Sequence, residues 1–347
     1  MRCLTTHATV FASCLALSAQ AMAWENETSA MLGAGGLKFE QTDKLRMERE
    51  ELYLSPREIR VTYTIRNLTD QDVRSGVAFP TPEINVGDMN ETPHKFHKSG
   101  REGDVFDFDI EVNGATVAGT YDARAIIKAA DGSERDVTDL LRKHKVPLID
   151  PDQDLLDGKV TDELVAAEIF VNGGHGPDTF ERPAWSLRAT YNWTQVFLPR
   201  QETRITLRYK PVLGAADYST AYDGDINDPK KFNGEWCPDD AFARAARKLP
   251  ATNPAKYVRL GQLGYFLASG PKWTGPVGTF RLEIDKAGAD LVSLCPVPGL
   301  RLQRRGESYV AESVDYTLAT DIKLLFVYRA CDKAPCGMHG DWPGYPR

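Results

Sequence analysis

Polar and apolar residues alternate with a period of two along much of the chain. From Ile59 to Arg66 every second residue is apolar, and the alternation is clearer still from Phe106 to Val112. A period of two places one face of a strand in a core and the other in water. Further runs of alternating or apolar residues occupy 73–79, 106–112, 116–121, 185–193, 205–209, 265–268, 279–284, 290–294, 308–312 and 322–328. The pattern therefore predicts a mainly β protein.

Local signals add one tight turn and a few short helices. Asn113-Gly114 follows the run 106–112 and supplies the two positive φ values of a hairpin, with the return strand expected at 116–121. Capping residues and terminal cations indicate helices. These are expected at 136–144, from Thr161 to near Asn172, and at 239–249. We expect the first two to form an insertion carried by a sheet.

The chain has 347 residues, which is enough for about two domains. A polar stretch rich in Asp, Asn and Gly, from Tyr218 to Gly234, provides a soft boundary. We therefore expect two β-sandwich-like units with a few short helices inserted. The N-terminal unit covers residues 24–213 and carries the helical insertion, and the C-terminal unit covers 214–347, with one helix and an irregular tail.

Residues 1–23 have the pattern of a signal peptide. Arg2 precedes an apolar run from Val10 to Ser18, and Ala21-Met22-Ala23 forms a small-x-small cleavage site. A lipid anchor at Cys14 is less favoured because this cysteine lies inside the apolar run. No later stretch reaches 18 apolar residues, so the mature chain is not expected to span a membrane. The expected location is the periplasm or the exterior.

Removing this segment would leave four cysteines, and an even number in an exported chain favours disulfides. Three pairings are possible. Cys331 and Cys336 are close enough to form a local loop, which would leave Cys237 to pair with Cys295 over a long range. A zinc site is disfavoured because neither Cys237 nor Cys295 belongs to a close pair.

The charge balance narrows the choice of partners. Lys and Arg number 42 against 49 Asp and Glu, a net charge of −7. No general attraction to nucleic acid or to anionic lipid is expected from this balance.

Candidate chemical groups are sparse and have ordinary explanations. The acidic stretches 150–157 and 223–228 lack the terminal Glu of a calcium loop, and His94 and His97 lie between lysines without an acid nearby. Solvated loops explain them better than metal sites. His175, in a glycine-rich loop, is a candidate general base, but no Gly-x-Ser-x-Gly nucleophile accompanies it. No cofactor is expected.

Two tryptophans are candidate binding residues together with His175. Trp185, Tyr191 and Trp193 share one face of a predicted strand, where core packing is favoured over a platform for sugars or peptides. Trp273 differs because it lies in the turn-rich segment 269–276. It is either an anchor between domains or a contact for a partner.

Several segments, read in order, resemble a known family. They are 26–37 (NETSAMLGAGGL), 47–54, 59–82 (IRVTYTIRNLTDQDVRSGVAFPTP), 112–114, 191–197 (YNWTQVF), 209–211, Cys237, 267–280 (LASGPKWTGPVGTF) and 293–295. The chain resembles exported bacterial proteins catalogued as domain of unknown function 4424, although the family more often has Thr-Thr-Gly-Ala at 268–271. The resemblance implies a β-rich envelope or periplasmic protein and transfers no catalytic residue.

These observations support two hypotheses about function. The first is a non-catalytic binding or assembly module for a cell-envelope component, which would be a protein or a glycan. The alternative is a hydrolase of envelope polymers that uses Asp and Glu carboxylates brought together by folding.

Export makes a direct prediction about the mature N-terminus. Cleavage after Ala23 leaves Trp24 as the first residue of the exported protein. N-terminal sequencing of the protein recovered from the periplasmic fraction checks this, and an intact Met1 in that fraction would contradict it.

Overall fold

The computed structural model describes most of the chain between residues 37 and 329. The described residues are 37–39, 43–81, 83–87, 101–151, 158–172, 181–211, 213–219, 236–246, 248–249, 257–267, 275–318 and 320–329. The expected signal peptide at 1–23 lies outside them.

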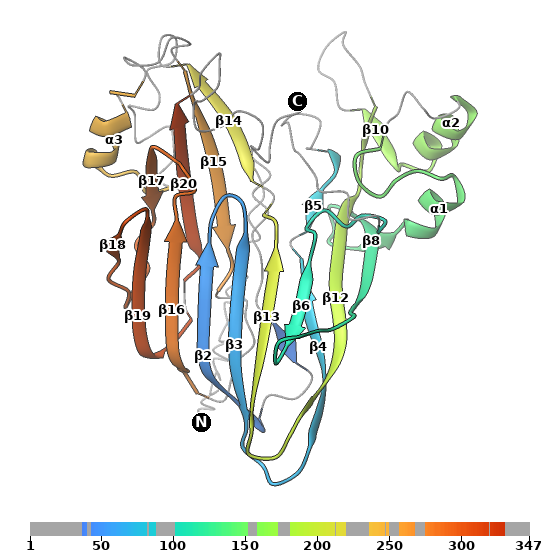
Figure 1. The fold of residues 1–347 in the computed structure, drawn as a ribbon. Helices are drawn as coiled ribbons and strands as arrows, with labels where there is room; N and C mark the ends of the chain where they lie inside the picture. Colours follow the sequence, from blue (N-terminus) through green and yellow to red (C-terminus); the bar gives the residue numbers. More distant parts are fainter. Residues whose placement is uncertain are drawn as a thin grey trace, which may run out of the picture.

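The largest sheet has eight strands in the order β18-β19-β16-β2-β3-β13-β6-β7 (Figure 1). They are β18 (Gln303–Arg305), β19 (Ser308–Tyr316), β16 (Val277–Asp285), β2 (Leu45–Leu54), β3 (Ile59–Asn67), β13 (Glu202–Tyr209), β6 (Asp109–Val112) and β7 (Ala115–Thr116). All neighbours are antiparallel except β2 and β16, which pair in parallel. The sheet takes strands from both sides of residue 213, where the sequence predicts a boundary between two units.

Three smaller sheets complete the β structure. The six-stranded sheet contains β1 (Lys38–Phe39), β4 (Val73–Pro80), β12 (Ser186–Phe197), β8 (Thr120–Lys128) and β9 (Glu134–Asp136) in that order, with β5 (Ile84–Asn85) beside β12. The four-stranded sheet has the order β14 (Gly214–Ser219), β15 (Tyr257–Tyr265), β20 (Ile322–Arg329) and β17 (Leu291–Leu294). The last sheet pairs β10 (Phe170–Asn172) with β11 (Glu181–Pro183). The predicted mainly β fold class is confirmed.

The described helices are short and overlap the three predicted ones, but the second begins before Thr161 and ends at Ala166, because residues 170–172 form the strand β10. They are α1 (Thr138–Lys143), α2 (Gly158–Ala166) and α3 (Asp240–Ala246). Figure 1 shows α1 and α2 together beside β8 and β10, as an insertion carried by the six-stranded sheet. Among the residues described, no helix is long and apolar enough to cross a membrane.

One face of the eight-stranded sheet packs against two other sheets. Toward the six-stranded sheet, the rings of Phe79 on β4 and Tyr209 on β13 have centroids 5.5 Å apart. Toward the four-stranded sheet, Leu263 and Phe326 belong to the same buried cluster as Leu52 of β2. A single core therefore extends across all three sheets. Burial of apolar surface at this scale is the main force that stabilises them.

The hairpin at Asn113-Gly114 is confirmed, but its strands differ from the prediction. Asn113 and Gly114 have φ values of 49° and 82°, as a two-residue turn of this kind requires. The first strand begins at Asp109 and not at Phe106, because the φ of 51° at Asp107 breaks the extended backbone. The single return strand expected at 116–121 is divided between β7 and β8.

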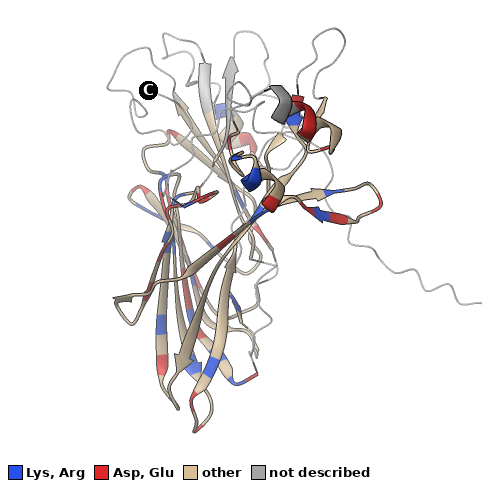
Figure 2. Cartoon of the chain, turned by 90° about the vertical axis from the view of Figure 1, so that its right-hand side faces the viewer, with Lys and Arg blue, Asp and Glu red and all other residues tan. Residues whose placement is uncertain are grey.

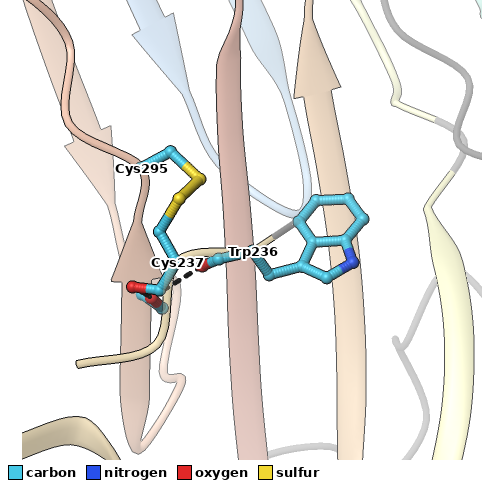
Figure 3. The surroundings of a disulfide bond; sticks show 4 residues. Trp236, Cys237 and Cys295 are labelled. Carbon is cyan, nitrogen blue, oxygen red and sulfur yellow. Dashed lines mark hydrogen bonds between the residues drawn. A yellow bond between two sulfur atoms is a disulfide. The ribbon is translucent and has the colours of Figure 1, made fainter. Parts of the chain in front are cut away.

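A disulfide joins Cys237 to Cys295, the long-range pairing that the sequence predicts, across a sequence separation of 58. Figure 3 shows the bond beside Trp236, whose carbonyl oxygen accepts a hydrogen bond from Ser293 Oγ at 2.9 Å. The Trp236 side chain is buried with Phe242 of α3 in a second apolar cluster. The disulfide thus holds the segment that leads into α3 against the end of β17. The other two candidate cysteines, at 331 and 336, lie outside the described residues.

Removing this disulfide should destabilise the fold. Closing a loop of this length contributes roughly 3–5 kcal/mol, so the free energy of unfolding should fall by about that amount in the variant Cys237→Ala/Cys295→Ala. Urea denaturation of the oxidised proteins measures the difference. The matched control is Cys331→Ala/Cys336→Ala. Equal midpoints for the wild-type protein and the Cys237→Ala/Cys295→Ala variant would contradict the prediction.

A β-bulge in β2 depends on a glycine in the neighbouring strand. The register with β3 shifts between Met47 and Arg49, which leaves Glu48 as the extra residue. Its carbonyl oxygen would lie 2.6 Å from a Cβ atom at Gly278 of β16, closer than a real Cβ contact allows. The bulge therefore needs a residue without a side chain at position 278.

The variant Gly278→Ala should be less stable for this reason. Backbone atoms have to move apart to accept the methyl group, and overpacking of this kind costs about 1–3 kcal/mol. Thermal melting compared with the neighbouring variant Thr279→Ala, which removes atoms and adds none, tests it. A Gly278→Ala protein that melts with the wild type would show that the bulge relaxes freely.

Candidate functional site

A polar groove of about 430 Å3 lies on the outer face of the eight-stranded sheet. Most of its lining side chains point outward from five neighbouring strands. The pairing register of these strands aligns the side chains in two rows that run across the sheet. The first row is Arg281, Glu51, Thr62, Thr206 and Glu111, and the second is Glu283, Tyr53, Arg60, Arg208 and Asp109. Of these ten residues all except Asp109 line the groove, together with Arg204 and the hairpin glycine Gly114.

Arginine and glutamate side chains form ion pairs across this surface. Arg204 lies 3.3 Å from Glu51, and the side chain of Arg208 pairs with Glu111 on the adjacent strand β6. Arg281 likewise pairs with Glu283, two residues further along the same strand, at 2.9 Å. These side chains are about one quarter to one half exposed. The groove therefore offers donors and acceptors in alternation.

The floor of the groove is formed by two threonines. Thr62 and Thr206 are directly opposite each other on β3 and β13, and both are buried. Their Oγ1 atoms are 3.3 Å apart and share one hydrogen bond. Because a hydroxyl group both donates and accepts, the pair keeps capacity for a further hydrogen bond to a ligand.

Tyr53 gives the groove an aromatic group. The Arg60 guanidinium lies over its ring, 4.8 Å from the centroid, and the Tyr53 hydroxyl donates a hydrogen bond to Asp285 at 2.7 Å. Burial and the neighbouring Asp285 carboxylate raise the pKa of Tyr53 to about 12. Its hydroxyl is therefore protonated at neutral pH. The cation–π contact holds both side chains in place.

Charges of both signs are also mixed elsewhere on the surface. Figure 2 shows basic and acidic residues interspersed along the long strands and on the helical insertion.

Trp193 is the predicted binding residue whose position the structure describes. It is 7% exposed, and its strand neighbour on β4 is Val77, followed by Phe39 on β1. The side chain belongs to the main core and also borders a pocket of about 600 Å3 that includes Lys38 and Val117. Trp193 therefore packs in the core, the role that the sequence favours for it, and it also borders an open pocket.

The other candidate residues fall outside the described part of the chain. Nothing is placed for His175 or Trp273, nor for the histidines at 94 and 97 or the acidic stretch 223–228. Sequence reasoning missed the groove because its residues come from five strands. The signal that could have found it is the recurrence of Arg and Glu at outward strand positions, as at Arg60, Glu111 and Arg204.

Fold and groove together define a β protein that buries one face of a large sheet and presents ordered, paired charges on the other. The chain belongs to the family catalogued as domain of unknown function DUF4424, whose model matches residues 25–323.

Comparison with solved structures finds distant likenesses. A Legionella pneumophila protein described as a "putative nutrient binding protein" aligns with 86% of this chain and 72% of its own, at 14% identity and a TM-score of 0.44. A likeness of this size carries no argument about function. No curated protein matches the chain.

Proposed function

We propose that the protein is a non-catalytic binding module, exported to the periplasm or beyond the cell, that holds a glycan of the cell envelope in the polar groove. The observation that carries the proposal is the pair of aligned rows, in which arginines, glutamates and threonines from five strands converge on one surface. Side chains on paired strands are held rigidly, and a preformed site loses less entropy on binding.

The chemistry of the lining favours a polyhydroxylated ligand. A hydroxyl group both donates and accepts, so it can bridge an arginine and a glutamate that already form a pair, such as Arg204 and Glu51. Four arginines face three glutamates, so the charges of the lining nearly cancel and do not favour a highly charged ligand of either sign. An apolar ligand would displace water from the charged groups and give them no hydrogen bonds in return. The volume of about 430 Å3 lies within the range of small-molecule sites.

The hydrolase alternative has less support in this groove. Glycoside hydrolysis needs one carboxyl group that donates a proton and a second that acts as base or nucleophile. Here Glu51, Glu111 and Glu283 each form an ion pair with an arginine, which suits a charged acceptor and not a proton donor. The arrangement therefore favours binding over cleavage.

Variants of two groove arginines, one from each row, test the proposal. Replacing Arg208 and Arg281 with glutamine removes two donors and leaves two glutamates unpaired, so affinity for an envelope glycan should fall at least tenfold. The measurement is a glycan-array screen of the wild-type protein, followed by calorimetry with the best ligand.

The matched control removes the same number of charges elsewhere. Arg200 and Arg304 are 61% and 63% exposed and lie outside the groove, so Arg200→Gln/Arg304→Gln should bind like the wild type. Equal losses in both double variants would reject the groove as the site. Release of reducing ends from the bound glycan would instead favour the hydrolase.

A further inference from the structure

Four polar side chains are buried in the core between the eight-stranded and four-stranded sheets. Glu50 on β2 lies directly opposite Tyr63 on β3, and Tyr209 comes from β13 of the same sheet. Tyr265 comes from β15 of the four-stranded sheet. All four are buried, with the Glu50 residue only 2% exposed.

The three tyrosine hydroxyls of this group are not fully satisfied. The hydroxyl oxygens of Tyr63, Tyr209 and Tyr265 are buried without a hydrogen bond of normal length and angle, and Tyr63 and Tyr265 interact only with each other and with Glu50 and Tyr209. Among the described residues, no Lys, Arg or His forms an ion pair with Glu50. Buried polar groups are nearly always satisfied, and a set of unsatisfied groups calls for water or an ion between them.

Electrostatic interactions link the four groups in pairs, Glu50 with Tyr63 and Tyr265, and Tyr209 with Tyr63 and Tyr265. Burial raises the pKa of Glu50 from 4.5 to about 8. Burial also raises the pKa of Tyr63 and of Tyr265, and the nearby Glu50 charge raises both further. The pKa of Tyr209 is raised by burial first and then by Tyr265. On β16 the residue opposite Glu50 is the apolar Phe280, and Glu50 is the one group of the four whose pKa lies near neutral pH.

We propose that this cluster is a site for one monovalent metal cation, of the sodium or potassium class, with Glu50 as the charged ligand. The tyrosine hydroxyls provide neutral oxygen ligands, and the Glu50 charge acts on Tyr63 and Tyr265. Hard cations prefer oxygen ligands of this kind. A single positive charge neutralises the one carboxylate, whereas a divalent ion would leave an uncompensated buried charge.

A proton competes with the metal ion for the same carboxylate, which fixes the pH dependence. Without a metal ion, the folded state holds one more proton than the unfolded state between pH 4.5 and about 8. Stability from this group is therefore greatest at low pH, falls as the pH rises through this window, and is constant above it. A bound cation restores stability where the proton has left.

The test compares melting temperatures in sodium, potassium and choline chloride at equal ionic strength, at pH 6 and pH 9. We expect sodium or potassium to raise the melting temperature above that in choline by several degrees at pH 9, with saturation, and by less at pH 6. The variant Glu50→Gln should lose this difference. The matched control is Glu307→Gln, which changes an exposed glutamate and should retain it.

Tyr63→Phe provides a second variant that keeps the carboxyl group. This variant should need a higher cation concentration for half of the stabilising effect. Sodium or potassium should still raise its melting temperature above that in choline. Identical melting temperatures in all three salts at pH 9 would overturn the proposal, and a shift that survives in Glu50→Gln would place the cation elsewhere. A pH effect lost in Glu50→Gln without any cation dependence would mean that the site holds water and a proton only.

Discussion

The parallel pairing of β2 with β16 is the contact on which the rest of the structure depends. It runs from Arg49 opposite Thr279 to Leu54 opposite Ile284, and it joins strands from opposite ends of the chain. Contacts at such sequence separation are costly in loop entropy and form only when burial compensates for it. Here the compensation comes from the inner face of β2 and β16, where Leu52, Leu282 and Ile284 are buried.

That pairing also creates both candidate sites. Without β16, the groove would lose Arg281 and Glu283, which begin its two rows. On the inner face, β16 places Phe280 beside Glu50 and closes the polar cluster on that side. The same sheet therefore supports a solvent-facing site and a buried one, because alternate residues of each strand point to opposite faces.

Much of the strand pattern could be predicted from the sequence, while the site could not. Alternation located β3, β12 and β13, and the Asn113-Gly114 turn and the Cys237–Cys295 pairing are both present. The strand β2 was missed because its bulge interrupts the period of two. The groove was missed for a different reason. Its residues are neighbours only through register across five strands, and pairing partners cannot be read from one strand's own pattern.

The bulge at Glu48 decides which residues of β2 enter which site. With strict alternation from Met47, Arg49 and Glu51 would point into the core, and Glu50 would point outward. The extra residue reverses the phase, so Arg49 and Glu51 reach the outer face while Glu50 and Leu52 are inside. An unpaired arginine in the core would be far more costly than a carboxyl group that can bind a proton or a cation. Gly278 of β16 has no side chain and so leaves space for the bulge at Glu48. Because the bulge decides which residues of β2 face inward and which face outward, this glycine contributes to both sites.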